Sequence, residues 1–293
     1  MRQLPDLKAM LVSLPSLALL FLLSAGAVFG GGDDLRDEHD EILKRIQASP
    51  MDEPIDLESR EENNLVRGEI HALMEHDFGT LADALKSASN WCEVTFLHLN
   101  VKACVSAEQD DESASLRVYM GPKHFQAPEE ATAMDLTFRM LDLKDDYLDA
   151  ELVGDEGPYG TRNFRMEMEA LPSGNERTLL RFRYSLEIGG ATRMAMDFYL
   201  STAGADKVGF SKTEDKEELV GGQRGMIERN VMRFYLALQA YLDTLAKPED
   251  ERLQARLERW FNLTERYPEQ LRELDRETYL SQKERERQEQ EAL

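Results

Sequence analysis

The sequence predicts an α+β protein in which a curved antiparallel sheet of about six to seven strands wraps around one long C-terminal helix, followed by a helical tail. Two features of the 293-residue chain predict this class. Between Asn64 and Ile188, apolar residues alternate with charged ones, which is typical of strands with one face in the core and one in water. Between Ile227 and Leu245, apolar residues recur every three or four positions, which predicts a long amphipathic helix.

The first residues have the pattern of an exported protein. Arg2 and Lys8 precede the apolar run Met10–Leu23, and small residues follow it up to Ala27. The run is shorter than the roughly 20 apolar residues that a membrane span needs. We therefore expect residues 1–27 to be a signal peptide that is cleaved near Ala27, and the protein to be periplasmic or secreted. The alternative is an inner-membrane anchor formed by an uncleaved N-terminal helix.

The chain is strongly acidic, with a formal net charge of −22 at pH 7. Such a charge is repelled by phosphate backbones and by anionic bilayer surfaces, so no nucleic-acid partner is expected. High solubility is the simplest consequence of the charge, and a cationic partner is the alternative.

Residues 28–62 are expected to form a flexible or helical leader. Gly30–Asp34 is a flexible sequence, and the pattern near Glu38–Gln47 predicts a short helix that is followed by a linker with two prolines. The first strand is expected to begin after Asn64. The residues that share its apolar face are Val66, Ile70, Ala72 and Met74.

A helical stretch follows this strand. Asp77 is a suitable N-cap, and apolar residues then recur at helical spacing from Phe78 to Ala88. Further strands are expected after Val101, and glycines and prolines supply the turns between them. Their alternating segments are 101–106, 116–120, 134–140, 148–152, 164–169 and 180–188.

A helix is expected at Ala191–Thr202, before the glycine-punctuated loop that leads to the long helix. The insert that contains both, Ala191–Gly222, is flanked by glycines and is a candidate lid. The long helix is expected to end before Pro248.

This order of elements resembles the helix-grip fold of START-like lipid-transfer domains, polyketide cyclases and aromatases, and the birch-pollen allergen group, all of SRPBCC type. The residues that carry the resemblance are "SASNW" at Ser87–Trp91 and the closing helix at Gly225–Leu245. The likeness covers roughly Asn64 to Ala246, so we expect a helix-grip domain at residues 63–248. The segment "WCEVTFLHLNVK" also resembles the sequences of secreted bacterial proteins of unknown function.

Residues 249–293 are expected to form a charged helical tail. Apolar or aromatic residues keep a spacing of four and three from Leu253 to Leu274, and Pro268 is expected to begin a second helix. One interpretation is an arm that binds a protein partner through a short coiled coil. The other is a helix that packs back on the domain.

Cys92 and Cys104 are the only two cysteines. In an exported protein such a pair predicts a disulfide first, and two buried free thiols are the alternative. A reactive thiol would need an activating base such as His98 in a fixed geometry. A metal site is not expected, because paired C-x2-C elements are absent from the sequence.

Methionines are frequent on the predicted inward faces. Methionine is flexible and polarisable, so such a face can line a pocket for an apolar ligand, although an ordinary core that uses methionine is the alternative. Tyr184 and Asn230 would supply polar contacts in the pocket. The candidate ligand-binding residues are Met134, Phe138, Phe182, Tyr184, Asn230, Phe234 and Leu238.

We therefore expect a periplasmic binding or carrier protein that holds a hydrophobic small molecule, such as a lipid, a fatty acid or a polyketide-like compound, in a helix-grip cavity. The alternatives are a cell-envelope scaffold that uses its tail and, less expected, a cyclase- or hydrolase-type enzyme. No catalytic residue or cofactor is predicted, and the sequence lacks the G-x-S-x-G motif of the hydrolase elbow.

Overall fold

The computed structural model describes residues 33–108, 113–174, 176–202, 204–213 and 218–293. The predicted signal peptide, residues 1–27, lies outside the described residues. Within the described ranges, none of the helices has the length and apolar character that a bilayer crossing requires.

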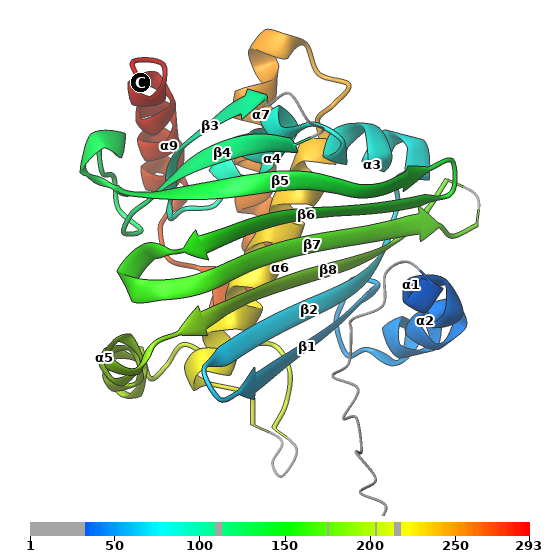
Figure 1. The fold of residues 1–293 in the computed structure, drawn as a ribbon, viewed down its shortest axis with the longest axis horizontal. Coiled ribbons are helices and arrows are strands. Elements are labelled where there is room, and N and C mark those ends of the chain that lie inside the picture. The colour runs from blue at the N-terminus through cyan, green and yellow to red at the C-terminus, as the bar shows by residue number, and fades with distance from the viewer. Residues whose placement is uncertain (1–32, 109–112, 175, 203, 214–217) are drawn as a thin grey trace, which may run out of the picture. The chain divides into compact units, whose positions relative to one another are not determined.

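One antiparallel sheet of eight strands forms the centre of the domain, in the order β1-β2-β8-β7-β6-β5-β4-β3. Its inner face packs on the long helix α6, Gly222–Asp243, which crosses behind the sheet in Figure 1. This arrangement confirms the predicted class. The strands are β1 (Ile55–Glu62), β2 (Leu65–Met74), β3 (Val101–Glu108), β4 (Ser113–Met120), β5 (Thr132–Lys144), β6 (Tyr147–Glu156), β7 (Thr161–Pro172) and β8 (Thr178–Ile188).

Strand β1 corrects the prediction for the leader. We placed residues 55–62 in a linker, but they pair with β2 in full antiparallel register, so the sheet has eight strands. The period-two pattern is weak here because only two inward residues, Ile55 and Leu57, are apolar, and the next inward residue is Ser59, which is buried and donates to Glu228 of α6 at 2.6 Å. Asn63, with a φ of 55°, makes the tight turn to β2.

The inner face of the sheet carries the core. One row of cross-strand neighbours joins Phe138, Leu152, Met166, Tyr184 and Gly68, from β5 to β2. The row ends at a glycine for a steric reason, because a Cβ at Gly68 would lie 3.1 Å from the Val231 side chain of α6. The long helix therefore approaches the sheet most closely at β2.

The outer face of the sheet is partly covered by the leader helices α1 (Asp33–Asp37) and α2 (His39–Ala48). Helix α2 corresponds to the helix predicted near Glu38–Gln47. Leu35, Ile42 and Ile46 pack on Leu171 and Leu179, which point away from the main core. The small outer cluster explains why these helices remain in place on a face that the alternation predicts to be polar.

The covered part of the outer face also buries charged groups. Glu169 accepts hydrogen bonds from Tyr147 (2.9 Å), Arg181 (3.3 Å) and Arg183 (2.8 Å). His71 lies on the outer face of β2, but it is buried beneath α2 and contacts Arg45. These groups are paired with each other, as buried charges must be.

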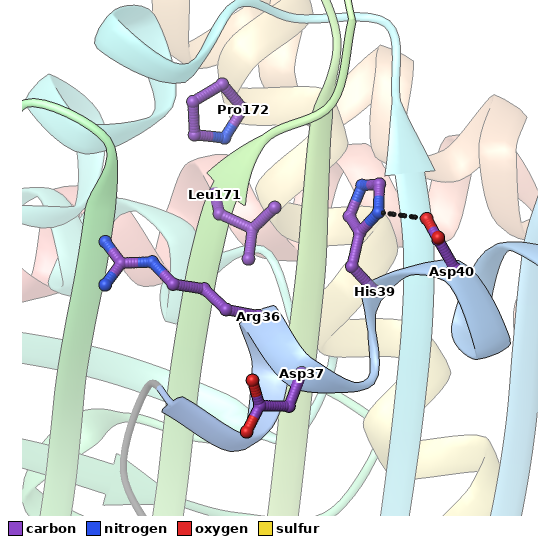
Figure 2. A pocket seen from close by; sticks show the side chains of 6 residues that line it. All are labelled: Arg36, Asp37, His39, Asp40, Leu171 and Pro172. Atoms are coloured by element: carbon purple, nitrogen blue, oxygen red, sulfur yellow. Dashed lines mark hydrogen bonds and ion pairs between the residues drawn. The ribbon is translucent and has the colours of Figure 1, made fainter.

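A shallow hollow of about 340 Å³ lies between α1 and the end of β7 (Figure 2). Arg36, Asp37, His39 and Asp40 form most of its wall, and His39 hydrogen-bonds Asp40 at 3.0 Å. A wall of this charge does not suit the apolar ligand that the sequence predicts.

The C-terminal tail packs back on the domain. It forms α7 (Glu249–Thr264), α8 (Pro268–Leu271) and α9 (Arg276–Gln290), and Pro268 begins a helix as predicted. Trp260 is buried, its indole N–H donates to the Arg233 carbonyl of α6 at 3.0 Å, and its ring stacks on Tyr279. The apolar residues of the tail are therefore buried against the domain itself.

Candidate ligand site

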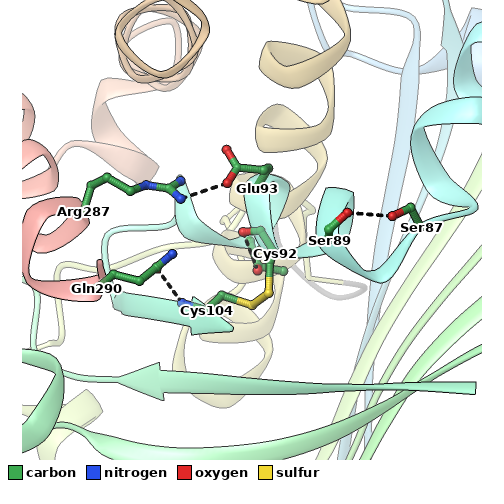
Figure 3. Close-up of a disulfide and its surroundings, with 8 residues drawn as sticks. Ser87, Ser89, Cys92, Glu93, Cys104, Arg287 and Gln290 are labelled. Carbon is green, nitrogen blue, oxygen red and sulfur yellow. Dashed lines mark hydrogen bonds and ion pairs between the residues drawn. A yellow bond between two sulfur atoms is a disulfide. The ribbon is translucent and has the colours of Figure 1, made fainter. Parts of the chain in front are cut away.

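A disulfide joins Cys92 of α4 (Ala88–Phe96) to Cys104 of β3, with a Cα–Cα distance of 5.2 Å (Figure 3). Helix α9 covers this bond, because the Cys104 N–H donates to Gln290 at 2.9 Å and Arg287 pairs with Glu93 at 2.9 Å. Both cysteines are used, which leaves no thiol to act as a nucleophile.

Four rings form a continuous row between the sheet and α6, which we name the aromatic row. It consists of Phe164 on β7, Tyr184 on β8, Phe234 on α6, and His98 in the turn between α4 and β3. Phe164 meets Tyr184 edge-on at 5.3 Å between centroids, and Tyr184 meets Phe234 at 5.7 Å. Phe234 stacks on the His98 imidazole at 4.6 Å. Such distances are typical of favourable ring contacts.

His98 is the polar end of the aromatic row. It is only 2% exposed, and its Nδ1 accepts the backbone N–H of Asn100 at 3.2 Å. Burial, followed by the charges of Arg233 and Lys283, holds the pKa of His98 well below its usual value, so the ring is neutral. A neutral ring that accepts at Nδ1 carries its proton on Nε2.

The Nε2 atom of His98 has no hydrogen-bond partner among the described residues. Asn230 lies beside the ring and favours its charged form, but the two side chains do not reach hydrogen-bond geometry. An unpaired buried donor costs about 1–3 kcal/mol, which makes it the feature of the interior that most needs an explanation.

The predicted ligand-binding residues divide into two groups. Tyr184 and Phe234 belong to the aromatic row and are buried, with exposed fractions of 6% and 5%, and Asn230 is partly exposed beside them. Phe182 and Leu238 have no accessible surface, so they belong to the closed core.

Met134 and Phe138 lie further away, on β5. Phe138 packs on the Trp91 ring at 5.8 Å, and Met134 is paired with Val118 of β4. The structure brings Tyr184, Asn230 and Phe234 together with His98. Among the described ring contacts, that of Phe138 is with Trp91 and not with the aromatic row.

The N-terminal half of α6, which leads to Phe234, is not fully buried. Met226 and Asn230, one turn apart, are partly exposed, whereas most of their neighbours on the helix are buried. Helix α5, Gly190–Ser201, contacts the first turn of α6, where Gln223 donates to Asp197 at 2.7 Å, and its partly buried Met196 packs on the core. Its Met194 and Phe198 side chains are 71% exposed on the other side.

The tail fixes the segment that carries His98. The Tyr279 hydroxyl donates to the Leu97 carbonyl at 2.8 Å, and the Lys283 ammonium donates to the Val101 carbonyl at 2.6 Å. Sequence reasoning missed His98 as a site residue because these partners lie about 180 positions away. The available signal was a histidine inside the apolar run "FLHLN".

Comparisons with known proteins identify no family. No protein-family model matches the chain, and no curated protein matches it.

Several solved structures are similar in part. A STAR-related lipid transfer protein from Xanthomonas axonopodis gives a TM-score of 0.40 at 9% identity, over 67% of this chain and 96% of the other. Human StAR-related lipid transfer protein 5 gives 0.37 at 12% identity, over 71% and 95% of the two chains. The Zhui aromatase/cyclase from Streptomyces sp. R1128 gives 0.36 at 14% identity, over 68% and 94%. Lipid transfer proteins and aromatases are among the groups that the sequence pattern resembles, and the fold assignment itself rests on the strand order and register.

Proposed function

We propose that this chain is a binding protein that holds a hydrophobic small molecule against the aromatic row, between the sheet and α6. The observation that carries the proposal is the neutral, unpaired Nε2–H of His98 at the end of an otherwise apolar row. Binding sites for small molecules are mostly apolar with a few placed polar groups, and His98, Asn230 and Tyr184 are such groups here.

Helix α5 is the proposed cover of this site. It lies in the insert Ala191–Gly222 that we predicted to be a lid, and it meets the partly exposed start of α6 through the hydrogen bond from Gln223 to Asp197. A movement of α5 away from Met226 would open a path to Phe234.

We also propose that the protein is exported and acts as a periplasmic carrier. The signal-peptide pattern before Ala27 supports export, and so does the disulfide, because disulfides persist in oxidising compartments. In this proposal the tail serves the site by holding residues 97–101 rather than by docking a partner.

Methionine-methyl NMR tests the location of the site. The protein is labelled with 13C at its methionine methyl groups and titrated with a soluble fatty acid below its micelle concentration. We expect the signals of Met226 and Met196 to shift with saturation, because Met226 lies one turn before Asn230 on α6 and Met196 lies on the proposed cover α5, and both side chains pack on the core. Met140 lies on β5, away from α5, so it is the internal control and its signal should stay in place. A shift of Met140 alone, or no shift at all, would contradict the proposal.

A further inference from the structure

The charge around His98 indicates what kind of polar group its free N–H binds. Lys102 and Lys283 are fully buried, and each donates to one oxygen of the same buried carboxylate, Glu286, at 2.9 Å. Two ammonium groups therefore share a single carboxylate, and one positive charge of this triad is unbalanced.

The two ammonium groups are already saturated by protein acceptors. Lys102 also donates to the Leu99 and His124 carbonyls, each at 3.0 Å. Lys283 donates to the Val101 carbonyl and lies 3.7 Å from the centre of the Phe96 ring. They therefore act on a ligand through their electric field, and the direct donor is His98.

The field of the triad reaches the site. After burial, the charges of Arg233, Lys283 and Lys102 lower the pKa of His98, which means that a positive potential acts at the imidazole. Arg233 shares the Glu273 carboxylate with Lys123 and Lys207, so this neighbouring cluster adds surplus positive charge to that of the triad. Water is excluded here, and such a field is screened far less than at the surface.

We infer that the ligand of this site is an otherwise apolar molecule with a carboxylate, which accepts the Nε2–H of His98 while its apolar part lies along the aromatic row. The inference rests on the proposed function and deepens it by naming the ligand class. The carboxylate would satisfy the unpaired donor and balance the surplus charge, and the neighbouring Asn230 amide can supply a second N–H. A neutral ligand would accept the His98 hydrogen bond but would leave the surplus positive charge unbalanced.

A matched pair of probes tests this inference. A fatty acid with a fluorophore at its far end and the methyl ester of the same molecule are titrated into the purified protein below their micelle concentrations. We expect the acid to bind about tenfold more tightly than the ester, because hydrogen bonds to charged groups are stronger than those to neutral ones. Equal dissociation constants for the two probes would overturn the inference and leave the proposed function intact. Binding of neither probe would overturn both.

Two substitutions of His98 test whether this residue causes the preference for the acid over the ester. His98→Phe keeps a ring of similar size on Phe234 but has no donor, so we expect the acid to lose its tenfold preference and the ester to bind unchanged. His98→Gln keeps an N–H at a comparable reach and should retain part of the preference. Thermal unfolding of both variants shows whether the fold is kept. If the full preference survives in a folded His98→Phe protein, His98 is not the anchor and the inference fails.

Discussion

Glu286→Gln is expected to lower the free energy of unfolding by about 3–5 kcal/mol. The change keeps the shape of the side chain but removes the carboxylate that pairs with the buried ammonium groups of both Lys102 and Lys283. A buried charge that loses its partner keeps its desolvation cost without compensation. Burial already lowers the pKa of Lys283 to about 8, against the opposing charge of Glu286.

Urea unfolding measures this effect, with Glu284→Gln as the matched control. Glu284 lies on the same helix and is exposed, so its substitution should change stability by less than about 0.5 kcal/mol. Equal effects of the two substitutions would mean that α9 does not bury its charges against β3, and the account of the positive triad would fail.

Trp260→Ala is expected to cost about 3–5 kcal/mol, as for other large buried side chains that are truncated to alanine. Trp260 is 2% exposed, it donates to the Arg233 carbonyl at 3.0 Å, and it stacks on Tyr279 at 4.9 Å. Its loss would leave a cavity between α7, α9 and the long helix.

Gln254→Ala is the control for this substitution, because Gln254 is exposed on the same helix and its side chain donates to the neighbouring Glu258 at 2.8 Å. We expect it to leave the unfolding midpoint in urea nearly unchanged. If Trp260→Ala leaves the unfolding midpoint as unchanged as Gln254→Ala does, the tail does not pack on the domain. That result would favour the hypothesis that the tail binds a protein partner.

The class of the fold could be predicted from the sequence because the relevant patterns are local. The alternation around Val66 and Tyr184 and the stripe from Ile227 to Leu245 correspond to β2, β8 and α6. The strand at residues 55–62 was missed because its inward positions after Leu57 are polar, at Ser59 and Glu61, and only pairing with β2 shows that it belongs to the sheet.

The candidate site could be predicted only in part. Tyr184 and Phe234 followed from the inward faces of a strand and a helix, and the structure brings them together. His98 depends on Tyr279 and Lys283, which come from the far end of the chain. Phe182 has the same inward direction as Tyr184, but Tyr184 is the one whose ring contacts Phe234, and alternation along one strand cannot predict this.

Native mass spectrometry, after gentle purification from a host that exports the protein, tests most directly whether the interior binds an apolar molecule. We predict a species that carries one apolar molecule, lost on denaturation, and a gain of about two hydrogens on reduction as the disulfide opens. A protein that appears only at its bare mass and does not take up an added fatty acid at saturating concentration would contradict the central claim.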